Sequence, residues 1–395
     1  MTGWARRARK AGGGSLVGLV GAGTALMLIA GGGPAAGADL QASRVDQGSP
    51  TFTDPTRITN PLFPKDRRTQ VIQLGVEGEG TVRFEVTQLP DPRVISWEGR
   101  RIKTVVTHFV AYTNGRLVEV ALDYYAQSDD GAVWYFGEDV DNYADGLLVD
   151  HDGTWLAGRD GPPGMIMPAR PRVGDVYRPE NIPGLVFEEA TVTAVGLTVP
   201  GPRGPVKGAI RVSARLLDGT VEEKIFTPGY GEFEAVIASK AERYGVALAV
   251  PADARGGSLP QEVSGLTAGA DRILDAAPGG HWDRIGITLR QMDRAWRSYQ
   301  RLQVPPRLRS QLSTSLTALG DAVAARDPGA TEQAAIDVGQ ACLDLQLIHR
   351  DRTAVDRARL ALWRDQLAVD RAGGDPALAA GDLATIRAIQ QRIDD

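Results

Sequence analysis

The chain has 395 residues, with 44 Lys and Arg residues against 49 Asp and Glu residues and a formal net charge of −5. A net acidic chain lacks the basic surface that phosphate binding needs, which argues against a nucleic-acid partner. The single cysteine, Cys342, excludes an internal disulfide, so stability must come from apolar burial. The length is sufficient for two ordinary domains.

The N-terminal residues 1–38 have the pattern of a secretory signal peptide. Basic residues at 6–10 precede an uncharged apolar run at 15–30, and small residues at 36–38 offer a cleavage site before Asp39. The apolar run is short for a membrane span, which takes about 20 residues. We therefore predict a secreted or extracytoplasmic protein with no stable membrane span after signal removal. An uncleaved membrane anchor is the alternative, and residues 39–57 are expected to be a flexible N-terminal segment.

Residues 58–250 have the pattern of a β-rich domain. Segments rich in Val, Thr and Tyr alternate apolar and polar residues, and Gly and Pro interrupt them at short intervals. Asn114-Gly115 and Asp218-Gly219 are typical of tight hairpin turns between two such segments. The predicted strands are 70–76, 80–86, 103–112, 117–125, 132–140, 190–199, 208–217 and 220–227. So many sequential strands favour an antiparallel β barrel or a strongly curved sheet.

Residues 251–267 are expected to be a linker, and residues 268–395 a helical domain. Beyond the linker the apolar residues recur at helical spacing, as in Ile285, Leu289 and Met292. Short connections that contain Gly and Pro indicate antiparallel neighbours, which predicts a bundle of four or five helices. The predicted fold class is therefore α+β, with the sheet and the antiparallel helical bundle segregated along the chain.

The helical domain is rich in mixed charges between positions 351 and 371. Asp356, Arg359 and Asp370 are members of this set, and opposite signs recur at helical spacing. Such a pattern usually marks a solvent-exposed helix face with surface ion pairs. Binding of an acidic partner to this face is the less favoured alternative.

One motif, DG-x-VWYFGED, extends from Asp130 to Asp139. It is accompanied by ITNPLFP at 58–64 and by GTWLAG at 153–158. Together these residues resemble a family of secreted bacterial proteins for which no activity is known. The resemblance implies a secreted β domain, and it transfers no functional residue to this chain.

Aromatic residues gather around the motif. Alternation along a strand places Trp134 and Phe136 on one face and Tyr135 on the other. With Tyr124 and Trp155 close in sequence, one face of the sheet gains an aromatic platform. Packing in the core is the favoured interpretation, because aromatics dominate core energetics. The alternative is a site for an apolar or amphiphilic small molecule, with Tyr124, Trp134, Phe136 and Trp155 as its candidate ligand-binding residues.

An acidic string follows the motif, with Asp139, Asp141 and Asp145 preceding Gly146. Calcium sites need several oxygen ligands that converge from a tight turn. The spacing departs from the EF-hand pattern, and Asp also favours turns for its own reasons. Plain turn chemistry is the favoured interpretation, and a calcium site at these three residues is the alternative. No other cofactor is predicted.

The chain has no G-x-S-x-G and no H-E-x-x-H motif, so neither a nucleophilic serine nor a zinc-peptidase site is indicated. We therefore expect a non-catalytic binding or structural protein. One alternative is a hydrolase acting on glycan or lipid through carboxylates such as Glu138 and Asp160. Another is an interaction module that docks a cell-envelope partner through its helical bundle.

Overall fold

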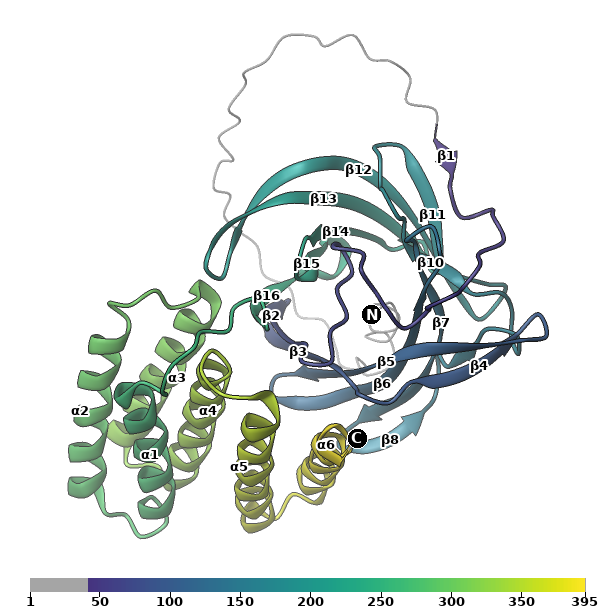
Figure 1. Ribbon diagram of the computed structural model, residues 1–395. Helices are drawn as coiled ribbons and strands as arrows, with labels where there is room; N and C mark the ends of the chain where they lie inside the picture. Colours follow the sequence, from purple (N-terminus) through teal and green to yellow (C-terminus); the bar gives the residue numbers. More distant parts are fainter. Residues whose placement is uncertain (1–41, 395) are drawn as a thin grey trace, which may run out of the picture.

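The computed structural model of the protein describes residues 42–394, so the predicted signal peptide and its cleavage site lie outside the described residues. Within that range a large sheet precedes six helices, where the sequence predicted four or five. Figure 1 shows the helices beside the sheet. The α+β class and the segregation of strands from helices are therefore confirmed. The hydrogen-bonded sheet curves strongly but is not closed into a barrel, so the curved sheet is the predicted alternative that forms.

The sheet has sixteen strands and is mostly antiparallel. The strands are β1 (Ser43–Arg44), β2 (Gln70–Glu77), β3 (Gly80–Gln88), β4 (Arg93–Trp97), β5 (Arg100–Thr113), β6 (Arg116–Gln127), β7 (Val133–Ala144), β8 (Leu147–Asp150), β9 (Trp155–Leu156), β10 (Gly164–Met167), β11 (Asp175–Ile182), β12 (Val186–Gly201), β13 (Gly204–Leu216), β14 (Val221–Thr227), β15 (Gly231–Ile237) and β16 (Glu242–Val250). Their order is β1-β11-β12-β13-β14-β15-β16-β2-β3-β5-β6-β7-β10; β4 pairs with β5, and β8 and β9 pair with β7.

Both predicted hairpin turns are present. Asn114 and Gly115 have φ of 50° and 73° between β5 and β6, the left-handed conformation that a type I′ turn requires. Gly219 has φ of 84° between β13 and β14. These turns fix the register of their strands, so that residues alternate between the inner and the outer face of the curve.

The helices follow the sheet in the chain. They are α1 (Gln261–Ala276), α2 (Trp282–Tyr299), α3 (Pro306–Ala325), α4 (Pro328–Gln346), α5 (Arg352–Gly373) and α6 (Pro376–Asp394). Helix α1 begins at Gln261, within the segment that the sequence assigned to the linker. The apolar stripes form the core of the helical part: Ile285 and Met292 of α2 are buried together with Leu308 and Leu312 of α3.

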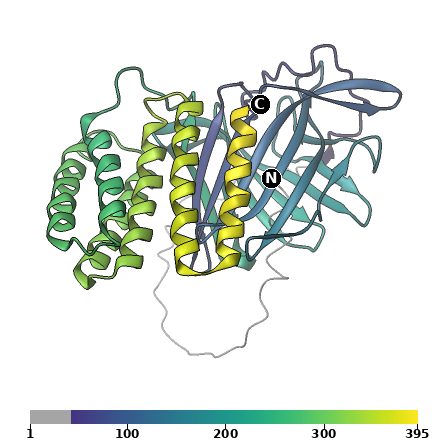
Figure 2. The same cartoon turned by 90° about the horizontal axis from the view of Figure 1, so that it is seen from below.

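The helices lie along one outer side of the sheet (Figure 1). Seen from below, α4, α5 and α6 run side by side, and α5 and α6 lie in front of the strands (Figure 2). Helix α6 packs on β6 and β8, whereas α1 and α2 lie away from the sheet (Figure 1). None of the helices within 42–394 is long and apolar enough to span a membrane.

Candidate functional site

The predicted aromatic residues lie in the core of the sheet. The rings of Phe136 and Phe52 pack edge to face with centroids 5.5 Å apart, while Tyr135 stacks on Tyr125 at 4.8 Å. Phe136 and Tyr135, which are adjacent on β7, thus pack against different rings. Trp134, Phe136 and Trp155 are all buried in one apolar cluster, and none of them lines either of the two cavities described below.

The fourth candidate, Tyr124, is also buried, and its hydroxyl donates to a carboxylate oxygen of Asp139 at 2.7 Å. The guanidinium of Arg93 lies 4.5 Å from the centre of the Tyr124 ring and also binds Asp139. Burial, and then the hydrogen bond to Asp139, raise the pKa of Tyr124 above its ordinary value. The prediction that these four residues bind a ligand stays untested, but each of them already has packing or polar partners within the fold.

The aspartates of the proposed calcium site have separate partners. Asp139 binds Arg93 and Tyr124, whereas a carboxylate oxygen of Asp141 lies 2.9 Å from Nδ1 of His151. Asp145 has φ of 49° in the turn before Gly146. Across the described range 42–394, no group of three or more His, Cys, Asp and Glu side chains is arranged to hold a metal ion.

The inner face of the curve carries buried polar side chains. Tyr135 donates to Asp123 at 3.1 Å, and Asp123 lies opposite Glu138 in the register of β6 and β7. Further along, Nζ of Lys224 lies 2.9 Å from both Glu188 and Glu222. The cavity beside these groups has a volume of about 20 Å³, which is room for about one water molecule. Beside Lys224 and Glu188, the inner face is therefore polar and leaves little free space.

The pKa values of two groups in this inner cluster, Glu138 and Lys224, are both raised above their ordinary values. Burial raises the pKa of Glu138 well above its ordinary value, and the neighbouring carboxylates of Glu180 and Asp123 raise it further. Burial alone would lower the pKa of Lys224, but Glu188 and Glu222 outweigh it and raise that pKa. The raised pKa favours the protonated form of Glu138, while Lys224 keeps its charge.

Asp160, the second carboxylate of the hydrolase alternative, lies in the turn after β9. It accepts from the backbone N–H of Leu156 at 2.8 Å and forms an ion pair with Arg159 at 2.7 Å. Asp160 and Glu138 therefore have different interaction partners.

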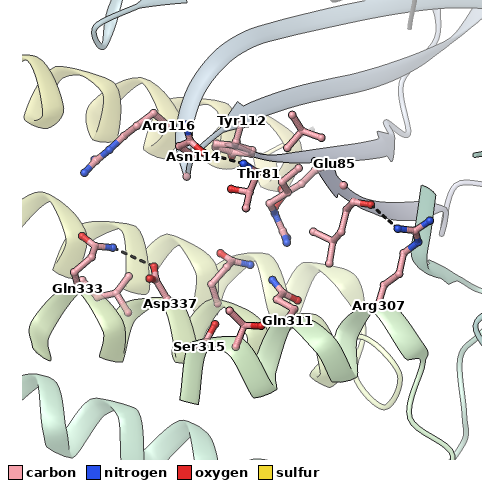
Figure 3. Close-up of a pocket in the computed structure, with 18 of the residues that line it drawn as sticks. Thr81, Glu85, Tyr112, Asn114, Arg116, Arg307, Gln311, Ser315, Gln333 and Asp337 are labelled. Atoms are coloured by element: carbon pink, nitrogen blue, oxygen red, sulfur yellow. Dashed lines mark hydrogen bonds and ion pairs between the residues drawn. The ribbon is translucent and has the colours of Figure 1, made fainter. Parts of the chain in front are cut away.

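The larger cavity is a cleft between the outer face of the sheet and the helices, shown in Figure 3. Its volume is about 850 Å³. Strands β2, β3 and β5 and the β5–β6 turn form one wall, and helices α3, α4 and α5 form the other. The lining of this cleft comes from segments far apart in the chain, so no local sequence pattern predicts it.

The walls of the cleft combine apolar and polar groups. The rings of Tyr112 and Trp363 stack across the interface, with centroids 5.9 Å apart and planes inclined by 17°. Apolar lining comes from Leu74, Val76, Val82, Ile336 and Leu362. Amide and hydroxyl groups come from Asn114, Ser310, Gln311, Thr314, Ser315, Gln333, Gln340 and Gln366. Arg307 lies at one end of the cleft, and Gln333 and Asp337 lie at the other (Figure 3).

A buried ionic network joins the two walls behind the cleft. Arg83 of β3 binds Asp344 of α4 through hydrogen bonds of 2.6 and 2.8 Å, and its guanidinium also binds Glu85 at 2.7 Å. Arg359 of α5 binds the same Asp344 at 2.8 Å and Asp356 at 2.9 Å.

Helix α6 completes the network. Its Arg392 binds Glu85 at 2.5 Å and Asp356 at 2.8 Å. Three arginines thus neutralise three carboxylates at the interface between the sheet and the helices.

This network overturns the expectation from the sequence for three of the charges at 351–371, whereas Arg357, Arg364 and Asp365 are exposed as expected. Asp356, Arg359 and Asp370 were expected on a solvent-exposed face, but all three are buried. Asp356 and Arg359 hold helix α5 to its neighbours and to Gln70 of β2, and Asp370 pairs with Arg116 of β6 at 2.6 Å. Burial of a charge is costly unless it is paired and hydrogen-bonded, and here each charge has partners.

The partners also set the pKa values of the buried acids. Burial alone would raise the pKa of Glu85, but Arg392 and Arg83 outweigh it and hold that pKa well below its ordinary value. The same balance between burial and the Arg83 guanidinium lowers the pKa of Asp344. The carboxylates therefore stay ionised, and the walls of the cleft are held together by charge-assisted hydrogen bonds.

Comparisons of the chain with protein-family models, with curated proteins and with solved structures found no match.

The residues of the DG-x-VWYFGED motif have structural roles here. Gly137 has φ of 117°, and a Cβ added to it would lie 2.1 Å from the carbonyl oxygen of Trp155. Asp130 accepts from the hydroxyl of Ser128 and from the N–H of Ala132 within one turn. These contacts shape a bulged strand and its turn.

Proposed function

We propose that the protein is a secreted, non-catalytic binding protein that holds an amphiphilic small molecule in the cleft between its sheet and its helices. The observation that carries the proposal is the cleft itself, with its volume of about 850 Å³ and its mixed lining. Sites for small organic ligands usually measure about 300–1,000 Å³ and combine apolar walls with a few polar groups.

The chemistry of the walls supports an amphiphile over a wholly polar ligand. Leu74, Ile336 and Leu362 offer aliphatic surface to a hydrocarbon part, and the stacked pair of Tyr112 and Trp363 offers a flat aromatic one. The amide side chains beside them supply donors and acceptors for a polar part. Export is supported by the signal-peptide pattern of residues 1–38.

The ionic network supports a cleft that keeps its shape without a ligand. Arg83 and Glu85 line the cleft, and both are fixed by partners on helices α4 and α6. A preorganised site loses less conformational entropy when a ligand binds. Binding is therefore expected to leave the orientation of the helices against the sheet unchanged.

The test uses a neutral fluorescent probe, N-phenyl-1-naphthylamine, whose emission rises in apolar surroundings. Thr314 of α3 is exposed and lines the cleft, so T314W fills the cleft with little risk to folding. Thr317 lies on the same helix, is also exposed and does not line the cleft, which makes T317W the matched control.

We expect saturable binding to the wild type, at least tenfold weaker binding to T314W, and unchanged binding to T317W. Equal binding to both variants, or no saturable binding to the wild type, would contradict the proposal. Native mass spectrometry of the exported protein would then identify the amphiphile it carries.

A further inference from the structure

We infer that the cleft selects amphiphiles with an anionic head group, which the guanidinium of Arg307 binds. This inference rests on the proposed function, because it names the ligand class for the same cleft.

Three arginines line the cleft, and two of them already have anionic partners. Arg83 binds Asp344 and Glu85, and Arg116 binds Asp370 at 2.6 Å and Asp382 at 3.4 Å. Their charges are neutralised within the protein, so neither has a free charge for a ligand.

Arg307 differs from these two arginines. It lies in the first turn of α3 and is half-buried, and its Nη1 donates to the backbone carbonyl of Leu74 at 3.2 Å. It has no ion-pair partner among residues 42–394 within 4.0 Å. Burial lowers the pKa of Arg307, and the nearby Arg243 lowers it as well, while Glu234 acts in the opposite direction. A half-buried guanidinium with most of its donors unused is suited to a carboxylate or a phosphate.

The backbone makes room for this side chain. A Cβ at Gly245 of β16 would lie 2.7 Å from Nη2 of Arg307, so a side chain at position 245 would displace the guanidinium from its place against the strand. The hydrogen bond to Leu74 fixes the side chain beside an apolar residue of the cleft wall. A head group at Arg307 would thus leave its hydrocarbon chain against Leu74 and the other aliphatic residues.

The far end of the cleft favours the same orientation. Asp337 lies there and accepts from the amide of Gln333 at 3.1 Å (Figure 3). A carboxylate at that end repels an anion, whereas the guanidinium at the other end attracts it. Arg116 also lies at the Asp337 end (Figure 3), but Asp370 and Asp382 pair with it. The guanidinium of Arg307, at the other end, therefore orients an anionic amphiphile with its head at Arg307.

The test compares dodecanoate with 1-dodecanol, which has the same chain length and no charge. Each displaces N-phenyl-1-naphthylamine from the wild type, from R307Q and from R309Q. Arg309 lies on the same helix, is exposed and does not line the cleft, so R309Q is the matched control for the loss of one positive charge.

We expect the wild type and R309Q to bind dodecanoate at least tenfold more tightly than 1-dodecanol. R307Q should bind both ligands with similar affinity. Equal affinity of the wild type for the two ligands would overturn the head-group inference and leave the proposed function intact. If neither ligand displaces the probe from the wild type, the proposed function itself fails. Loss of selectivity in R309Q as well would assign the effect to net charge and overturn the role of Arg307.

Discussion

Arg83 of strand β3 and Asp344 of helix α4 are joined by two hydrogen bonds, of 2.6 and 2.8 Å, although 261 positions separate them in the chain. The side chain of Asp344 has no exposed surface, and that of Arg83 is 13% exposed. Charge-assisted, bidentate contacts of this kind are strong and geometrically specific. They link the sheet to the helical part and thereby fix the walls of the cleft.

Removing one arginine from the network should destabilise the fold severely. In R359M the carboxylates of Asp344 and Asp356 each lose a buried partner, and such a loss typically costs about 3–5 kcal/mol. The free energy of unfolding in urea at pH 7 measures it. The control is R357M, because Arg357 is exposed on the same helix and its loss should change stability by about 0.5 kcal/mol or less. Equal effects of both variants would show that the network does not stabilise the interface.

The network should also make the protein sensitive to acid. The pKa of Glu85 in the fold is held well below its ordinary value of 4.5, and that of Asp344 below 3.8. Stability from a depressed pKa is fully present above the ordinary value and is lost as pH falls through the folded one. We expect the urea midpoint to fall steeply below about pH 4. D344N, which cannot ionise, should show a shallower fall, and an unchanged slope would contradict this assignment.

Glu242 should have the opposite pH dependence. Its side chain is buried on β16, and burial, with help from Glu77 and Glu222, raises its pKa to about 8. The folded protein keeps this proton while the unfolded chain releases it near pH 4.5, so this contribution to stability falls as pH rises from about 4.5 to 8. E242Q should therefore gain stability relative to the wild type between pH 5 and pH 8. E223Q, at an exposed position, should not, and a constant difference for E242Q would refute the prediction.

Trp155 should matter for stability and not for ligand binding. Its side chain is fully buried and packs edge to face on Tyr135 with centroids 5.4 Å apart. W155A should lower the free energy of unfolding by about 3–5 kcal/mol, as truncations of large buried aromatics do. Binding of N-phenyl-1-naphthylamine per folded molecule should be unchanged, because Trp155 does not line the cleft. A variant of near-normal stability that no longer binds the probe would instead support the aromatic site predicted from the sequence.

Calcium should leave the melting temperature unchanged. Asp139 and Asp141 are engaged with Arg93 and His151, and a ligand that binds the native state alone would raise the melting temperature. Melting curves with calcium and with a chelator measure this directly. A shift of several degrees would establish a calcium site in this segment.

Several parts of the fold were accessible from local sequence patterns. Alternation predicted β5, β6 and β7, and Asn114-Gly115 marked the turn between two of them, because hairpins need residues that tolerate positive φ. Alternation along a strand also places the adjacent acids Glu188 and Glu189 of β12 on opposite faces. The first is buried beside Lys224, and the second pairs with Arg178 and Arg215 nearer the surface.

The cleft and the network were not accessible in this way. The pairing of β16 with β2 brings residues 242–250 beside 70–77, and no local pattern specifies a contact across that distance in the chain. One signal was available: Arg359 falls four residues after the buried Val355 and three before Leu362, on the inward stripe of its helix. A charged residue on the inward stripe of a helix indicates a buried ion pair, but it does not identify the partner. The partner of Arg359 is Asp344, which lies on another helix.

The sequence by itself determined that a β-rich part precedes a helical part, and it determined the hairpin turns and the apolar stripes, because periodicity and turn chemistry act between residues close in the chain. It also showed that Trp134, Phe136 and Trp155 belong to one aromatic group, but it did not decide whether these side chains pack in the core or bind a ligand. The tertiary structure alone decided that they fill the core, that Arg83 meets Asp344, and that Arg307 faces an open cleft without an acidic partner among the described residues. The physical reason is that burial and charge compensation depend on which distant segments pack together, and that is a property of the whole fold.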